Sequence, residues 1–240
     1  GDQIVMIDSI ETKGMTIKDA SNLIKGELGS VVSLIIFRPS KRKKLTFDLI
    51  RANIIVKHVP YWGVDDEGIG YIRITKFSKN TAKDFSEALN DLKKQELSGL
   101  VIDLRSNSGG LLSNAINILD KLTDRGVNLL NTRGRIKKAN RKMNSRRVPA
   151  ISPEIPLAVL INQSSASASE IVAGVLQDLD RGVIVGTKSF GKGLVQSMYN
   201  LNDSTTLKVT TAKYYTPSGR LIQKEDYLDN GFLTDGLDKK

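Results

Sequence analysis

The chain has 240 residues, of which 40% are hydrophobic and 26% charged, as expected of a globular protein with a sizeable core. It has no cysteine and a single histidine, His58, which excludes disulfides, cysteine nucleophiles and metal sites built from several histidines. The formal net charge is +10, and no apolar run approaches the roughly 20 residues that span a bilayer.

The positive charge is concentrated in one segment. From Arg133 to Arg147 the sequence has eight basic residues and no acidic one, so the rest of the chain has a net charge of only +2. The segment lies between strand-like stretches and has no aromatic residue, which favours a solvated, mobile surface loop. Attraction of acidic substrates or anionic lipid headgroups is the main alternative, and we do not expect nucleic-acid binding.

Residues 1–52 predict a small β-rich module. Short strands are expected at 2–8, 31–39 and 45–50, the last of them with period-2 alternation. Between the first two, residues 16–29 place apolar side chains at helical spacing and end in a glycine, which predicts one helix.

Residues 53–240 alternate strands with helices after a short connector, which predicts a second domain of mixed α/β class. Two strands, at 99–104 and 156–162, are almost entirely apolar, as expected when both faces of a sheet are covered. The other expected elements are an apolar helix over 82–92, helices at 111–122 and from 167, and strands at 183–186, 194–200 and 205–213.

The stretch "NQSSASASEIVAGVLQD", residues 162–178, has four serines in six positions. Ser167 and Glu170 have capping-box spacing, so Ser167 alone could be a structural N-cap. The same position also suits a nucleophile, because α/β folds bind ligands where a buried strand runs into a helix. Free N–H groups at the start of that helix would stabilise an oxyanion.

A serine nucleophile needs a base. His58 lies far away in the connector with no acidic partner at a suitable spacing, and a structural role is expected for it. A lysine serves as base when burial lowers its pKa. In "GTKSFGKGLVQ" (186–196), Lys192 lies between two glycines, and Gln196 could orient its amine if the stretch is extended; Lys188 is the weaker alternative.

The turn "DLRSNSGG", residues 103–110, follows a buried strand and ends in two glycines. The N–H of Gly109 or Gly110 could donate to an oxyanion. A purely structural turn that needs positive φ is the alternative. A phosphate loop is weaker still, because neither GxGxxG nor a Walker pattern is present.

Taken together and in order, these stretches resemble the carboxy-terminal processing, or tail-specific, serine proteases. The resemblance covers nearly the whole chain and also includes "GYIRITKF" and "AKYYTPSGRLIQ". It implies Ser167 as the nucleophile, Lys192 as the general base and Gln196 as the residue that orients the lysine. It further implies Gly110 and Ala168 as the backbone donors of the oxyanion hole.

The resemblance also implies a fold: a crotonase-like layered α/β core with a β-rich cap over 53–240, preceded by a partial PDZ domain over 1–52. No metal or other cofactor is implied. The implied substrates are proteins or peptides with apolar C-terminal tails, and the implied location is the periplasm or cell envelope, with an export signal upstream of this sequence. Peripheral membrane association and homo-oligomerisation stay open.

The implied reaction is acyl transfer from a peptide bond, in which neutral Lys192 takes the Ser167 proton and water resolves the acyl-enzyme. The lysine must then be buried and unpaired. The main alternative is a catalytically silent PDZ-containing scaffold that binds peptides, and a carrier of small apolar ligands is a second one. The presence of Ser167, Lys192 and Gln196 together weighs against both.

Overall fold

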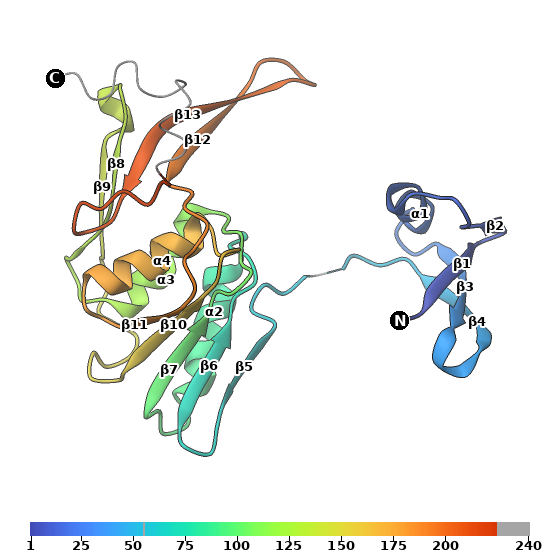
Figure 1. The fold of residues 1–240 in the computed structure, drawn as a ribbon, viewed down its shortest axis with the longest axis horizontal. Coiled ribbons are helices and arrows are strands. Elements are labelled where there is room, and N and C mark those ends of the chain that lie inside the picture. The colour runs from blue at the N-terminus through green and yellow to red at the C-terminus, as the bar shows by residue number, and fades with distance from the viewer. Residues whose placement is uncertain (55, 225–240) are drawn as a thin grey trace. The chain divides into compact units, whose positions relative to one another are not determined.

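The computed structural model describes residues 1–224 except Ile55. The chain folds as two compact units, Gly1–Val56 and Lys57–Lys240 (Figure 1). Within the described residues, no helix combines the length and apolar character needed to cross a membrane.

The first unit is an antiparallel sheet of order β2-β1-β3-β4 with one short helix, α1. The bounds are β1 Gln3–Ile7, β2 Ile10–Glu11, α1 Ile17–Ile24, β3 Val31–Arg38 and β4 Lys43–Ile50. A capping box starts α1, in which Thr16 Oγ1 accepts from Asp19 N–H at 3.2 Å. The core cluster is small, with Ile7, Val32 and Leu34 as its buried members.

The main sheet of the second unit has the order β11-β10-β7-β6-β5. Its strands are β5 Tyr61–Val64, β6 Ile69–Arg73, β7 Gly99–Asp103, β10 Leu157–Ile161 and β11 Val183–Gly186. The pairings β6–β7, β7–β10 and β10–β11 are parallel, and only β5 runs antiparallel to its neighbour. The carboxyl ends of β7 and β10, adjacent strands, therefore lie at the same edge.

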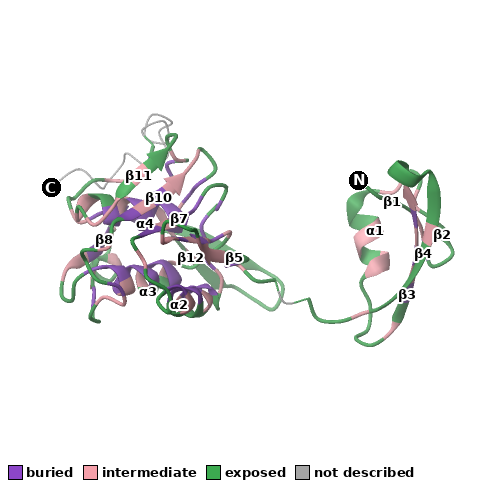
Figure 2. Ribbon diagram, turned by 90° about the horizontal axis from the view of Figure 1, so that it is seen from below, coloured by how far each residue is buried: buried purple, intermediate pink, exposed green. Residues whose placement is uncertain are grey.

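Three helices pack with this sheet: α2 Thr81–Leu92, α3 Leu112–Leu122 and α4 Ala168–Asp178. Helix α3 contacts both α2 and α4, and α2 also contacts β5 and β6. Their apolar stripes and the inner strands form the main core, where the buried residues are concentrated (Figure 2). The alternation of strands and helices confirms the prediction of a mixed α/β fold, while the crotonase-like and PDZ details stay predictions.

A second sheet of this unit, the cap sheet, has the antiparallel order β12-β13-β8-β9. Its strands are β8 Asn128–Arg133, β9 Arg141–Asn144, β12 Leu194–Asn200 and β13 Thr206–Tyr215. In Figure 1, β12 and β13 extend as a long hairpin from the α/β layers.

The basic segment is only partly the loop that its composition predicted. Residues 141–144 form β9, which pairs with β8, and Lys137–Ala139 form a short 3-10 helix in the connection. Side chains hold the turn closed, because Thr132 Oγ1 donates to Ala139 O and Gly134 N–H donates to Asn140 Oδ1. The prediction of a loop is wrong for residues 141–144, because backbone pairing with β8 makes them a strand despite their charge.

Candidate active site

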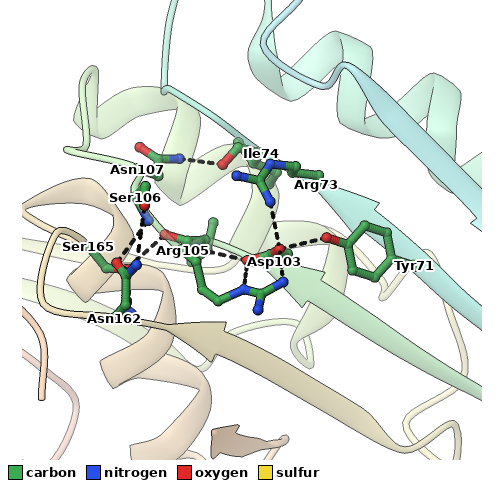
Figure 3. Close-up of polar contacts among 10 residues, drawn as sticks. Tyr71, Arg73, Ile74, Asp103, Arg105, Ser106, Asn107, Asn162 and Ser165 are labelled. Atoms are coloured by element: carbon green, nitrogen blue, oxygen red, sulfur yellow. Dashed lines mark hydrogen bonds and ion pairs between the residues drawn. The ribbon is translucent and has the colours of Figure 1, made fainter. Parts of the chain in front are cut away.

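Two turns lie side by side where β7 and β10 end. Residues 104–110 follow β7, and residues 162–167 connect β10 to α4. Asn162 joins them, because its Oδ1 accepts from Ser106 N–H at 2.9 Å (Figure 3). The same oxygen accepts from Ser164 N–H at 3.1 Å within its own turn. The predicted site therefore forms at the sheet edge where α/β folds bind ligands.

The four serines of the cluster have different roles. Ser165 and Ser169 are buried, and their hydroxyls donate to Leu104 O and Asn107 O, each at 2.8 Å. Ser164 is exposed, whereas Ser167 is half-buried. Two serines therefore fix the serine turn onto the glycine turn, and Ser167 is left at the surface of the junction.

Ser167 has an unusual backbone conformation, with φ +54° and ψ −112°. A non-glycine residue in a sparsely populated region costs about 1–3 kcal/mol and persists only where its surroundings impose it. Ser167 immediately precedes α4, so the unpaired N–H groups of the first turn and the positive end of the helix dipole lie beside its side chain.

The glycine turn packs directly against Ser167. Gly109 has φ +95°, and a Cβ there would lie 2.6 Å from Ala166 O and 2.8 Å from Ser167 Cβ. Gly110 is exposed, and a Cβ there would overlap Phe77 O. Within the described part of the chain, the N–H of Gly110 and that of Ala168 have no hydrogen-bond acceptor. Both donors that the resemblance implied are thus free for a ligand.

Glu170 connects the serine turn to the loop that contains Lys192. Its carboxylate is buried and accepts from Ser167 N–H at 2.7 Å, as the capping-box spacing predicted. It also accepts from Ser189 Oγ at 2.7 Å, Gly191 N–H at 2.5 Å and Lys192 N–H at 2.8 Å. One carboxylate therefore fixes the backbone of both residues proposed for catalysis.

The loop around Lys192 is held by close packing. A Cβ at Gly193 would lie 2.5 Å from Gln223 N, and Gly193 N–H donates to Gln223 Oε1 at 2.9 Å. The Lys192 and Gln196 side chains are exposed. Within the described residues, no hydrogen bond joins Lys192 to Ser167 or to Gln196, and Lys192 forms no ion pair.

The expectation that Lys192 is buried is wrong in this structure. Lys192 precedes β12, which begins at Leu194 and is an edge strand of the cap sheet. The Lys192 side chain, just before this edge strand, is exposed. The structure brings the Ser167, Gly110, Ala168 and Lys192 backbones to one site, but it does not bring the lysine amine to the serine.

A single buried carboxylate anchors the start of the glycine turn. Asp103, at the end of β7, is fully buried and accepts hydrogen bonds from Tyr71 Oη at 2.6 Å, Arg73 at 3.0 Å and Arg105 at 2.8 Å (Figure 3). Burial raises the pKa of the Asp103 carboxyl, but the hydrogen bonds from Arg105 and Tyr71 outweigh burial and the net pKa lies below 3.8. The carboxylate therefore stays ionised and holds the turn.

In the described part of the chain, neither His58 nor Lys188 forms a hydrogen bond with Ser167. The His58 carbonyl accepts from Thr75 N–H at 2.9 Å, and Lys188, like Lys192, is exposed. In the part of the chain that the structure describes, no group of three or more acidic or histidine side chains is placed to hold a metal ion.

The sequence did not predict the long-range hydrogen bonds of Glu170 or those of Asn107. Glu170 was assigned only to the capping box, because its partners at 189–192 are about twenty residues away. Asn107 is buried; its side chain donates to Ile74 O and accepts from Gly109 N–H, each at 2.9 Å. The polarity of Asn107 inside a turn next to a buried strand was the one local signal that could have singled it out.

Comparison with known proteins identifies the family of this chain. The family model for "Peptidase family S41" matches residues 68–231, which is more than half of the chain. The chain belongs to peptidase family S41. All elements that form the candidate site lie within the matched range.

Curated relatives of this S41 chain include a carboxy-terminal-processing protease of Bartonella bacilliformis, 42% identical over 228 residues, covering 93% of this chain and 51% of the relative. A chloroplastic C-terminal processing peptidase of Tetradesmus obliquus is 35% identical over 239 residues, with 93% and 50% covered. The chain thus spans about half the length of these relatives. A solved photosystem II D1 C-terminal processing protease matches with a TM-score of 0.62 and 34% identity, covering 93% of this chain and 60% of that one.

Proposed function

We propose that this chain carries the catalytic apparatus of a serine endopeptidase that cleaves the C-terminal regions of partly unfolded proteins. Ser167 is the nucleophile, Lys192 the general base and Gln196 the residue that orients the lysine. The N–H groups of Gly110 and Ala168 form the oxyanion hole. The observation that carries the proposal is the packing of the glycine turn onto Ser167, with unpaired donors on either side.

The reaction is acyl transfer. Ser167 Oγ attacks the substrate carbonyl and gives its proton to the neutral Lys192 amine, and the oxyanion accepts hydrogen bonds from Gly110 and Ala168. The protonated lysine then gives its proton to the leaving amine. In the second step Lys192 takes a proton from water, which attacks the acyl-enzyme, and then returns that proton to Ser167 Oγ as the acid product leaves. A positioned base contributes about 10²–10⁴ in rate, and each oxyanion donor about 3–4 kcal/mol.

Because the Lys192 amine is exposed and does not contact Ser167, the described conformation is an inactive, resting state of the proposed enzyme. Glu170 already holds the Lys192 backbone near Ser167, so rotation of the side chain and of the adjoining edge strand is the remaining step. A bound peptide that covers the edge of the cap sheet would exclude water from the amine and favour its neutral form. Substrate binding thus completes the site.

The proposed substrates are proteins with apolar C-terminal tails, recognised with help from residues 1–52 as part of a PDZ domain. The proposed location is the periplasm or cell envelope, where this chain would meet unfolded exported proteins. Fractionation of the producing cell, with an antibody against the chain, would test the location; recovery in the cytoplasm alone would contradict it.

Degradation of an unfolded reporter with an apolar C-terminus tests the proposed activity. We expect cleavage by the wild-type chain and loss of at least about 10³-fold in kcat for Ser167→Ala. Ser164→Ala is the matched control, because Ser164 lies in the same turn but is exposed. Equal cleavage by wild type and Ser167→Ala, or equal loss in both variants, would contradict the assignment.

The base is tested in the same assay. Lys192→Ala should lower kcat about 10²-fold or more, whereas Lys188→Ala, an exposed lysine of the same loop, should have little effect. If Lys188→Ala were the inactive variant, the two roles would have to be exchanged.

One observation favours the alternative of a catalytically silent peptide-binding scaffold: the Ser167 and Lys192 side chains do not meet in the described structure. That alternative predicts that the wild-type chain binds the reporter tail and never cleaves it. The cleavage assay therefore separates the two functions directly.

A further inference from the structure

A pocket of about 430 Å³ lies on one face of the cap sheet. Its walls come from the start of α3, the β8–β9 hairpin, and strands β12 and β13. Gly134 sets the hairpin against β13, because a Cβ at that position would overlap Thr211 O and lie 2.7 Å from Ala139 Cβ. We call this space the cap pocket.

The cap pocket has an apolar floor and a basic rim. Leu112, Met143 and Val195 line it and are half-buried, while Lys138 and Arg141 line it and are exposed. Among the described residues, no acidic side chain lines it. Neither Lys138 nor Arg141 forms an ion pair with any carboxylate in the described part of the chain.

Of the eight basic residues between 133 and 147, only Lys138 and Arg141 line the pocket in the described structure. Arg141 and Met143 lie on one face of β9 and line the pocket, while Lys142, between them, faces the other way. Other basic residues of the segment have different contacts: Arg133 lies 4.6 Å from the centre of the Tyr215 ring, and Arg147 pairs with Asp120 at 3.5 Å.

The cap pocket adjoins the candidate active site along the chain. Leu112 lies two residues beyond Gly110, and Val195 lies three residues beyond Lys192. Because consecutive Cα atoms lie about 3.8 Å apart, Leu112 lies within about 8 Å of Gly110. A peptide with its scissile carbonyl between Ser167 and Gly110 would therefore have a neighbouring side chain within reach of the pocket wall at Leu112, since an extended peptide spans about 3.3 Å per residue.

We propose that the cap pocket is a substrate subsite that takes an apolar side chain followed by acidic residues. The inference rests on the proposed peptidase function. The apolar side chain lies on Leu112, Met143 and Val195, and the carboxylates lie between Lys138 and Arg141. The substrate carboxylates then neutralise the positive charge of Lys138 and Arg141. The subsite therefore favours substrates in which acidic rather than neutral residues follow the apolar residue.

Binding of labelled peptides tests the proposal in the Ser167→Ala background, where no cleavage occurs. The probes are fluorescein-labelled hexapeptide amides that end in leucine and two glutamates, in leucine and two glutamines, or in serine and two glutamates. Fluorescence anisotropy gives each Kd. Two exposed charge pairs predict that the first peptide binds about three- to thirtyfold more tightly than the second. It should also bind more tightly than the third, because leucine buries apolar surface.

Matched double variants separate the pocket from general basic charge. Lys138→Gln/Arg141→Gln should abolish the preference for glutamate, while Lys137→Gln/Lys142→Gln should keep it, although both lower the net charge by two. Equal Kd values for the glutamate and glutamine peptides, or the same loss in both double variants, would overturn the proposal. Because nothing is cleaved, a failure of the proposed catalysis leaves this readout unaffected.

Discussion

Ser167 and Gly109 form the closest junction of the candidate site. Ser167, which has a positive φ, packs against Gly109, whose φ is +95°. Because Gly109 has no Cβ, there is room for the Ser167 side chain. Neither residue could hold this geometry without the other turn, since Ala166 N–H donates to Asn107 O at 3.0 Å across the junction. The proposed nucleophile is therefore positioned by backbone contacts.

Substitution of Gly109 by alanine should distort the junction. Gly126 is the control, because it has φ +89° and nothing within 4 Å of an added Cβ. We expect Gly126→Ala to cost about 1–2 kcal/mol from backbone strain alone, and Gly109→Ala to cost more and to abolish cleavage. Denaturant unfolding and reporter cleavage measure the two effects; equal stability losses with retained cleavage would contradict the packing argument.

Asp103 predicts a pH dependence of stability. Because its folded pKa is lowered, its contribution is fully present above the unfolded pKa of about 3.9 and is lost as the pH falls through the folded pKa. Asp103→Asn should be about 2–3 kcal/mol less stable than wild type at pH 7, since charged hydrogen bonds are lost. The gap should shrink as the pH falls below about 5 and through the folded pKa of Asp103. A gap that stays constant over that range in urea titrations would contradict the assignment.

At the scale of elements, Glu170 is the connection between the start of α4 and the loop before β12. Its four hydrogen bonds join residues that are up to 22 positions apart. The carboxylate acts through the backbone, and its oxygens face only donors. A neutral amide cannot satisfy this arrangement, because one of its two polar atoms is itself a donor.

Glu170→Gln should therefore loosen the loop. We expect a loss of about 1–3 kcal/mol in stability and a fall in kcat of about tenfold or more with KM little changed, because the Lys192 backbone is displaced. Glu154→Gln, at an exposed loop position, is the control and should change neither. Unchanged kcat in Glu170→Gln would show that the loop position does not depend on the carboxylate.

The local sequence pattern was enough to predict most helices and strands. It could not predict polar contacts between residues far apart in the sequence. Apolar strands and the capping box predicted β7, β10 and the start of α4 within about a residue. Strand β9 was missed, because the sequence "RKMN" lacks the alternation that marks a strand and gains its order from pairing with β8. The exposure of Lys192 could not be predicted, since it depends on what covers the edge of a sheet.

At the scale of the whole chain, the two units have unequal cores. The first has a core cluster of three buried apolar side chains, and its helix α1 has no buried residue. The second has an extensive core built from the main sheet and three helices. Because hydrophobic stabilisation follows buried apolar area, the second unit should be the more stable one.

Thermal unfolding followed by calorimetry should show two transitions, with residues 1–56 unfolding at the lower temperature. Val32→Ala, in the first core, should lower only the first transition, and Leu119→Ala, in the second core, only the second. A single transition that shifts with both variants would show that the units unfold together.

The central claim is that Ser167 forms the covalent intermediate. The most direct measurement is the mass of the chain quenched in acid during the first turnover of a peptide ester, with fragment mapping of the modified residue. We expect one acyl group, located on Ser167 and absent from Ser167→Ala. An acyl group on another side chain, or ester turnover that is unchanged in Ser167→Ala, would contradict it.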